Sequence, residues 1–236
     1  YNPIFGRTIL LQSKEYAYNS NNEYTLSTTD YEYNPVNYLV NKVKSTNSKG
    51  ELIETCTYYP NDYSIAGAID LLQINNIISN PVSSQTFVTK NGNQKYLLNG
   101  SVSEFGVLSN GDIKVSKTHS FRSSEPIIST LVPFNSSQLI PNTNYYKDTG
   151  SVIYDASSNP VQINSDNGKV SSIYDYDNKL PVATVINATT DDIAYTSFET
   201  ESLGGWSMNL GSSYVTDKSI TGKRSFSGSL NKTLIH

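Results

Sequence analysis

A short tyrosine motif that recurs along the chain constrains the fold more than any other feature. Two tyrosines separated by one residue and followed by Asn or Asp occur at residues 16–19, 31–34 and 174–177, and a half copy occupies residues 154–155. Each copy is followed by a turn and then by an alternating apolar run. One strand–turn unit cannot bury its own apolar face, so such units must stack on neighbours in an extended sheet. The repeat therefore predicts a structural or surface role rather than catalysis.

Composition indicates an all-β fold. Hydrophobic residues make up 36% of the 236 positions, and 18 positions are tyrosine. Tyr and Thr favour strands, whereas Asn, Gly and Ser favour the turns between strands. Because the chain has one methionine and little alanine, long helices are not expected. We predict strands with short turns and one short helix, in one large domain or two smaller ones.

Charge and hydropathy argue against nucleic-acid and membrane partners. The net charge is −4, and charged residues of both signs make up 16% of the chain, unlike the basic footprint of a nucleic-acid-binding protein. No apolar run approaches the roughly 20 residues of a membrane-spanning helix. The single cysteine, Cys56, lies in an alternating strand context, so we interpret it as a core residue rather than a nucleophile. Because the chain begins at Tyr1 and not at Met, we expect a fragment or a processed product.

Turn signals divide the chain into hairpins. These signals lie at residues 47–50, 91–93, 110–112 and 165–168, where Gly and Asn tolerate the positive φ of tight turns. The stretch 65–78 predicts the helix, and residues 151–163 are expected to form one strand of the hairpin around 165–168. Residues 123–144 contain three prolines and predict an irregular segment. The polar stretch 187–192 ends the pattern, so we place a domain boundary there.

Residues 154–163 resemble the YD-repeat unit of the RHS family, with Ser158 in place of the usual glycine before Asn159. Residues 172–183 and 58–63 resemble recurring segments of RHS-like surface proteins of Bacteroidetes. The resemblance implies that residues 1–188 form a YD-repeat β-sheet shell segment. In that family the shell encloses a C-terminal toxin or displays adhesive modules. It also implies export, commonly as a substrate of the type IX secretion system.

A second resemblance begins after the predicted boundary. Residues 194–199, 204–206 and 221–226 resemble the opening of a carbohydrate-binding-module-like β-sandwich, which is jelly-roll-like. Such a sandwich takes about 100 residues, so we expect a truncated module at residues 189–236. In related modules the Glu after Phe helps to hold a structural calcium through its hard oxygen, and this makes Glu199 the one candidate metal ligand. Trp206 is expected in the core of the module rather than on a ligand platform.

Candidate catalytic groups have simpler structural interpretations. Of the two histidines, His236 is the last residue, and His119 has no nucleophile elbow nearby, so we interpret His119 as a surface or hydrogen-bonded histidine. Asp155, Asp175 and Asp177 are candidates for the carboxylate pair of a glycosidase. However, an Asp after the strand Tyr is expected to accept bonds from the N–H groups of the turn. The tyrosines are interpreted as cross-strand stacks in preference to a sugar platform. We predict no catalytic and no cofactor-binding residues.

Two hypotheses for function follow. The first is a non-enzymatic structural segment of an exported, RHS-like cell-surface protein, which forms shell wall and carries downstream cargo or adhesive modules. Its expected location is secreted or on the cell surface. Its expected partners are proteins of an outer-membrane secretion or surface assembly, with polysaccharide as a second class, and neither nucleic acid nor a membrane span is expected. The alternative is a secreted carbohydrate-binding or carbohydrate-processing protein that acts through the C-terminal module.

Overall fold

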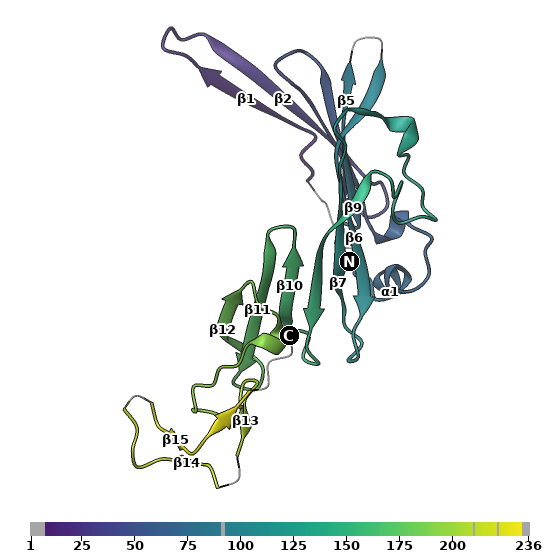
Figure 1. Cartoon of the computed structure of the whole chain (residues 1–236). Coiled ribbons are helices and arrows are strands. Elements are labelled where there is room, and N and C mark those ends of the chain that lie inside the picture. Colours follow the sequence, from purple (N-terminus) through teal and green to yellow (C-terminus); the bar gives the residue numbers. More distant parts are fainter. Residues whose placement is uncertain (1–7, 91–92, 210, 221, 233–236) are drawn as a thin grey trace, which may run out of the picture. The chain divides into compact units, whose positions relative to one another are not determined.

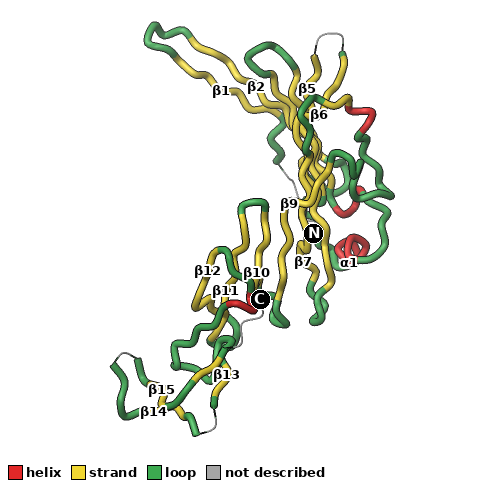
Figure 2. The backbone as a smooth tube through the Cα atoms, in the orientation of Figure 1, coloured by secondary structure: helices red, strands yellow, loops and turns green. Residues whose placement is uncertain are grey.

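The chain is built mainly from antiparallel strands, as its composition predicts. The structure, a computed structural model, describes residues 8–90, 93–209, 211–220 and 222–232. The main strands are β1 (Gln12–Tyr18), β2 (Tyr24–Tyr33), β3 (Val40–Thr46), β4 (Leu52–Tyr58), β5 (Ser83–Lys90), β6 (Gln94–Val107), β7 (Ile113–Phe121), β8 (Ile127–Ile128), β9 (Tyr146–Tyr154), β10 (Pro160–Ser165), β11 (Gly168–Asp175) and β12 (Leu180–Ile186). They pair in the order of the sequence, except that β8 pairs with β6 (Figure 1, Figure 2). The all-β prediction is confirmed.

The chain divides into two compact units that alternate along the sequence. The first comprises Tyr1–Glu104 and Thr118–Asp148, and the second comprises Phe105–Lys117 and Thr149–His236. The boundary that the sequence suggested between residues 188 and 189 lies inside the second unit, and it stays a prediction.

Asn and Asp side chains close the turns after several strands. Asn19, Asn34, Asn47 and Asp155 each follow a strand, and the Oδ1 atom of each accepts bonds from two backbone N–H groups of the turn. These bonds replace the ladder partners that the chain loses when it leaves the strand. The expectation that an Asp after the strand tyrosine bonds the turn is therefore confirmed at Asp155, and Asn19 and Asn34 close their turns in the same way.

The predicted hairpin turns are found where the structure describes them. Residues 47–50 join β3 to β4, and residues 110–112 join β6 to β7, where the N–H of Leu108 donates to the carbonyl of Asp112 at 2.8 Å. Asp166 and Asn167 join β10 to β11. Residues 91 and 92 of the fourth turn lie outside the described residues, but the flanking pair Lys90 and Gln94 is in register.

The core of the first unit lies on one face of its sheet. The buried cluster consists of Cys56, Phe87, Leu97, Val102, Val132 and Tyr146. The predicted irregular segment 123–144 contributes Val132 to this cluster and contains β8 and a 3₁₀ turn, η2 (Ser129–Leu131). Gln85 fixes the segment, because its Nε2 donates to the carbonyl of Val132 at 3.0 Å and to the hydroxyl of Tyr146 at 3.2 Å. A side chain at Gly100 would overlap with the Tyr146 ring, so glycine is required for this packing.

The predicted helix is present and shorter than the apolar stretch that suggested it. Helix α1 (Ala68–Ile74) buries Ile69 and Leu72, which are three residues apart on one face. Gln73 donates to the carbonyl groups of Pro60 and Tyr63 and so attaches the helix to the 3₁₀ turn η1 (Pro60–Asp62). The helix ends before residue 78 because Asn76 adopts a positive φ of 55°.

One strand of the second unit is shorter than predicted. Residues 151–163 do not form a single strand, because the turn 155–159 separates β9 from β10. Asp155 closes this turn and Ser158 has a φ of 69°, while the register shifts next to Pro160, which lacks a ladder donor. The half copy of the tyrosine motif therefore marks a hairpin of its own.

The end of the second unit forms two small antiparallel pairs. β13 (Ser207–Met208) pairs with β16 (Leu230–Asn231), and β14 (Ser213–Val215) pairs with β15 (Ser225–Ser227). Phe198 stacks on Phe226 with ring centroids 5.3 Å apart. Among the described residues, no helix combines the length and the hydrophobicity needed to cross a membrane.

Candidate functional site

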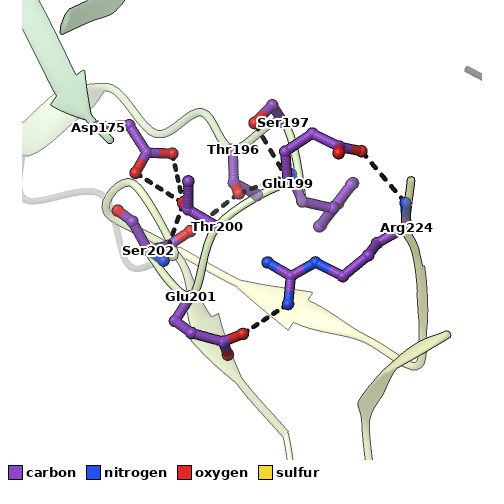
Figure 3. Close-up of polar contacts among 9 residues, drawn as sticks. Asp175, Thr196, Ser197, Glu199, Thr200, Glu201, Ser202 and Arg224 are labelled. Atoms are coloured by element: carbon purple, nitrogen blue, oxygen red, sulfur yellow. Dashed lines mark hydrogen bonds and ion pairs between the residues drawn. The ribbon is translucent and has the colours of Figure 1, made fainter. Parts of the chain in front are cut away.

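Glu199, the candidate metal ligand, lies in the loop before β13 and contacts the segment that enters β15 (Figure 3). Its two carboxylate oxygens accept bonds from the backbone N–H of Lys223, each at 3.0 Å, and one of them also accepts from the N–H of Arg224 at 3.2 Å. These donors occupy lone pairs that a calcium ion would use. The carboxylate therefore joins two segments of the module in the structure, and a structural calcium at Glu199 stays a prediction.

Gly222 makes this contact possible. It has a φ of 77°, and a Cβ atom at this position would overlap with the Glu199 carboxylate. Glycine adopts this backbone conformation at little cost and lets the carboxylate approach the main chain. The glycine and the glutamate of the sandwich-like motif thus serve one local interaction.

A second set of polar contacts connects β11 to the loop that carries Glu199. The hydroxyl of Thr200 donates to Asp175, whose two carboxylate oxygens lie 2.6 and 2.7 Å away (Figure 3). Asp175 lies between the two tyrosines of the third tyrosine motif and is buried. Next to Thr200, Glu201 pairs with Arg224 at 2.5 Å, and this hydrogen bond raises the pKa of Arg224. The Arg224 guanidinium also lies over the ring of Tyr214, 4.5 Å from its centroid.

The three candidate carboxylates of the repeat have separate hydrogen-bond partners. Asp155 closes the turn between β9 and β10, and Asp175 accepts from Thr200. Asp177 is exposed and lies 3.4 Å from the ammonium group of Lys179. The turn N–H partners expected from the sequence are present at Asp155, and Asp175 accepts one such bond, from the N–H of Tyr176 at 2.7 Å.

A cavity of about 310 Å³ lies in the second unit between the β10–β11 hairpin and the following loop. Its apolar lining is Val161, Ile173 and Ile193, and its polar lining includes Asp155 and Asn178. The Asp155 oxygens already accept from the turn and from the side chain of Asn159. Asp155 therefore serves the turn next to the cavity.

His119 is buried and not at the surface. Its side chain is 4% exposed, with Nε2 2.5 Å from Glu104 and Nδ1 2.8 Å from Asp148. The surface alternative for this residue is wrong, and the hydrogen-bonded alternative is confirmed. Because a carboxylate faces each ring nitrogen, neither nitrogen is left to accept the proton of a hydroxyl nucleophile. The three residues connect β6, β7 and β9 inside the first unit.

Cys56 lies in the core of the first unit, as its alternating context predicts. Its Sγ is 3.4 Å from Glu54, which also pairs with Lys95 and lies 3.9 Å from Lys42. Burial, together with the Glu54 carboxylate, raises the pKa of the Cys56 thiol. A thiol with a raised pKa is a poor nucleophile at neutral pH.

The repeat tyrosines of β1 form cross-strand aromatic contacts. The rings of Tyr16 and Tyr18 lie 5.2 and 5.7 Å from the ring of Tyr24 on β2. Other tyrosines use the hydroxyl group: Tyr33 donates to the carbonyl of Leu10, and Tyr154 donates to that of Val115. Cross-strand aromatic contact is confirmed between β1 and β2, whereas the hydroxyl groups of Tyr33 and Tyr154 bond backbone carbonyls.

Sequence reasoning missed the partners of His119 and Thr200. Each of these contacts joins residues more than fourteen positions apart. Strand pairing brings Glu104 to His119, and the fold of the loop after β12 brings Thr200 to Asp175. Trp206 is half-buried. Within the described part of the chain, no group of three or more His, Cys, Asp or Glu side chains is arranged to hold a metal ion.

No model of a known protein family matches the chain, and the search of curated proteins found no relative.

Proposed function

We propose that the chain is a non-enzymatic structural segment of an exported, RHS-like cell-surface protein. In this proposal residues 1–188 contribute sheet to the wall of a shell, and residues 189–236 begin a sandwich-like module that follows it. The protein is a substrate of a type IX secretion system, and its partners are proteins of the outer-membrane assembly that secretes or holds it.

The observation that carries the proposal is the shared construction of the turns. Asn19, Asn34 and Asp155 occupy equivalent positions after a repeat tyrosine and close their turns with the same pair of backbone bonds. The motif residues therefore stabilise the turns of the sheet, as in repeat proteins whose units stack on neighbours.

In the third copy the equivalent position is Asp177, which lies 3.4 Å from the ammonium group of Lys179. Asp175, between the two tyrosines of that copy, accepts from the N–H of Tyr176 and from the hydroxyl of Thr200, and the second bond attaches the following module to the last repeat.

The location can be tested on intact cells of the organism that encodes the protein. A short epitope inserted in the exposed turn at Lys49 should be labelled by antibody on cells that have not been permeabilised. Protease added to the same intact cells should degrade the protein. The double variant Asn34→Ala and Asp155→Ala should reduce the displayed amount, whereas Asn34→Asp with Asp155→Asn, which keeps both acceptors, should not. An epitope that is labelled only after cell lysis would contradict surface display.

The alternative, carbohydrate binding through the C-terminal module, predicts a different result. The full chain would then retain soluble or insoluble polysaccharide, and Trp206→Ala would abolish retention. Under the structural proposal, the chain shows neither polysaccharide retention nor turnover of esters, peptides or glycans.

A further inference from the structure

A polar pocket of about 370 Å³ lies in the first unit, next to its core. Cys56 lines the pocket and also belongs to the buried cluster. The volume is at the lower end of the range for small-molecule sites, about 300–1,000 Å³. Residues of β2, β3, β4, β6 and the turn η1 contribute its polar lining, which includes Glu32, Asn41, Lys42, Glu54, Asp62 and Lys95.

Asn41 reaches the pocket from a β-bulge. Lys42 lies opposite Glu32, and the next pair in the ladder is Val40 with Tyr33, so Asn41 is an extra residue without a register partner. Bulges of this kind re-aim a side chain and are frequent next to functional sites. The Oδ1 atom of Asn41 is buried and accepts no hydrogen bond from the described residues. Because a buried acceptor without a partner is costly, we expect a donor from outside the chain at this atom.

The ammonium group of Lys42 lies near two carboxylates but bonds neither. Its Nζ is 3.6 Å from Glu32 and 3.9 Å from Glu54, beyond the roughly 3.2 Å limit of an N–H···O bond. Both carboxylates are already held by other lysines. Lys44 donates to Glu32, and Lys95 donates to Glu54 at 2.5 Å. Within the part of the chain that the structure describes, the donors of Lys42 therefore lack a hydrogen-bonded acceptor.

Asp62 contributes a carboxylate without a cation. Its Oδ2 accepts a bond from the backbone N–H of Tyr59 at 2.7 Å and so closes η1. Its other oxygen accepts no bond from the described residues, and no described Lys or Arg side chain pairs with it. The pocket thus offers one ammonium group, one carboxylate and one amide oxygen whose bonding capacity is unused.

We infer that this pocket binds a free α-amino acid, with the ligand carboxylate at Lys42 and the ligand ammonium group at Asn41 and Asp62. An ammonium group has three N–H donors, enough for both oxygens, and a carboxylate accepts from Lys42. Hydrogen bonds between charged groups are about twice as strong as neutral ones. A neutral sugar would leave both protein charges without an opposite charge, and a simple anion or cation would leave one of them. The inference is independent of the proposed function.

The first test compares probes on the full chain by NMR titration. Glycine, L-serine, L-leucine, L-glutamate and L-arginine share the α-ammonium and α-carboxylate groups and differ in the side chain. At least one of them should bind with a dissociation constant of about 1 mM or lower and shift the amide signals of Asn41, Lys42 and Asp62. The N-acetyl derivative of that amino acid lacks the ammonium group, and its amide derivative lacks the carboxylate. Each derivative should bind about tenfold or more weakly.

The second test changes the protein. Lys42→Met removes the ammonium group and keeps the length of the side chain, and Asn41→Leu removes the acceptor at similar size. Each variant should weaken binding of the amino acid by about tenfold or more, while circular dichroism shows unchanged strand content. Lys14→Met on β1, outside the pocket, is the matched control and should bind as the unaltered chain does.

Three results would each overturn the inference. The first is that none of the five amino acids shifts these signals at about 10 mM, well above the expected dissociation constant. The second is that the N-acetyl and amide derivatives bind as tightly as the amino acid itself, and this comparison needs no variant to fold. The third is that Lys42→Met, correctly folded, binds as tightly as Lys14→Met.

Discussion

The turn closed by Asp155 offers a quantitative test of how the repeat works. Asp155 accepts backbone bonds from Ser157 at 2.9 Å and Asn159 at 2.8 Å, and its Oδ2 accepts a third bond from the Asn159 side chain at 3.0 Å. Asp155→Ala removes all three hydrogen bonds and leaves the two backbone N–H groups of the turn to bond water. The loss of a side-chain cap of this kind costs about 1 kcal/mol per backbone bond, so we expect the free energy of unfolding of this unit to fall by about 2 kcal/mol.

Asp155→Asn is the matched comparison, because Asn19, Asn34 and Asn47 show that an amide oxygen closes the same turn. This variant keeps both backbone bonds and loses the better acceptor for Asn159, so the cost should stay below about 1 kcal/mol. Urea titration followed by tyrosine and tryptophan fluorescence measures the cost, and hydrogen exchange at Ser157 and Asn159 localises it. Equal stability of the alanine and asparagine variants would refute the idea that the acidic residue of the motif is a turn acceptor.

Three further predictions concern other parts of the chain. Gly222→Ala should destabilise the C-terminal segment by about 2 kcal/mol or more, because it adds backbone strain and a clash with Glu199. Hydrogen exchange at residues 223–227 should become faster. Gly211, which has a φ of 82° and no atom near the position of an added Cβ, is the control, and Gly211→Ala should show only the cost of the backbone strain. His119→Ala should lower the free energy of unfolding of the first unit by about 2 kcal/mol, since it leaves Glu104 and Asp148 without the ring between them. Denaturant titration measures this loss, and Asp148→Asn should show a smaller one. An unchanged unfolding midpoint in His119→Ala would contradict the prediction. Burial raises the pKa of Tyr63 to about 12 from 10.0. Tyr63 therefore ionises first in the unfolded chain, and the free energy of unfolding falls as pH rises above about 9.5, by up to about 1.4 kcal/mol per pH unit from this group. The free energy of unfolding, measured from neutral to alkaline pH, should fall less steeply in Tyr63→Phe, and parallel curves for the two proteins would count against the assignment.

Local patterns predicted the strands and turns well, because both are set by neighbouring residues. Asn and Asp at the ends of strands bond N–H groups only two to four positions away, so the sequence alone contains the whole interaction. The stretch 151–163 misled the prediction because its apolar alternation continues across a turn that Asp155 closes. Helix α1 was located correctly, but its end depends on the backbone of Asn76, which apolar spacing does not report.

The candidate site was less predictable, since its contacts join residues that are far apart in the sequence. Glu199 was singled out as a candidate calcium ligand, and that role stays a prediction. Its observed partners are the backbone N–H groups of residues 223 and 224, which no spacing rule connects to it. The burial of His119 likewise follows from three strands that place carboxylates on both sides of one ring.

The pairing of strands in sequence order has a consequence for how the sheet forms. Apart from β8, each main strand hydrogen-bonds the main strands that directly precede and follow it along the chain. Most of these pairs close over a short loop, so the entropy lost in those steps is small. The exceptions are the pair of β4 and β5, which residues 59–82 connect, and the pair of β7 and β9, which residues 122–145 connect. A sheet of this topology can grow from either end, one strand at a time, without waiting for distant segments. A chain that emerges gradually, from a ribosome or from a secretion pore, can thus add each new strand to the edge left by the last one.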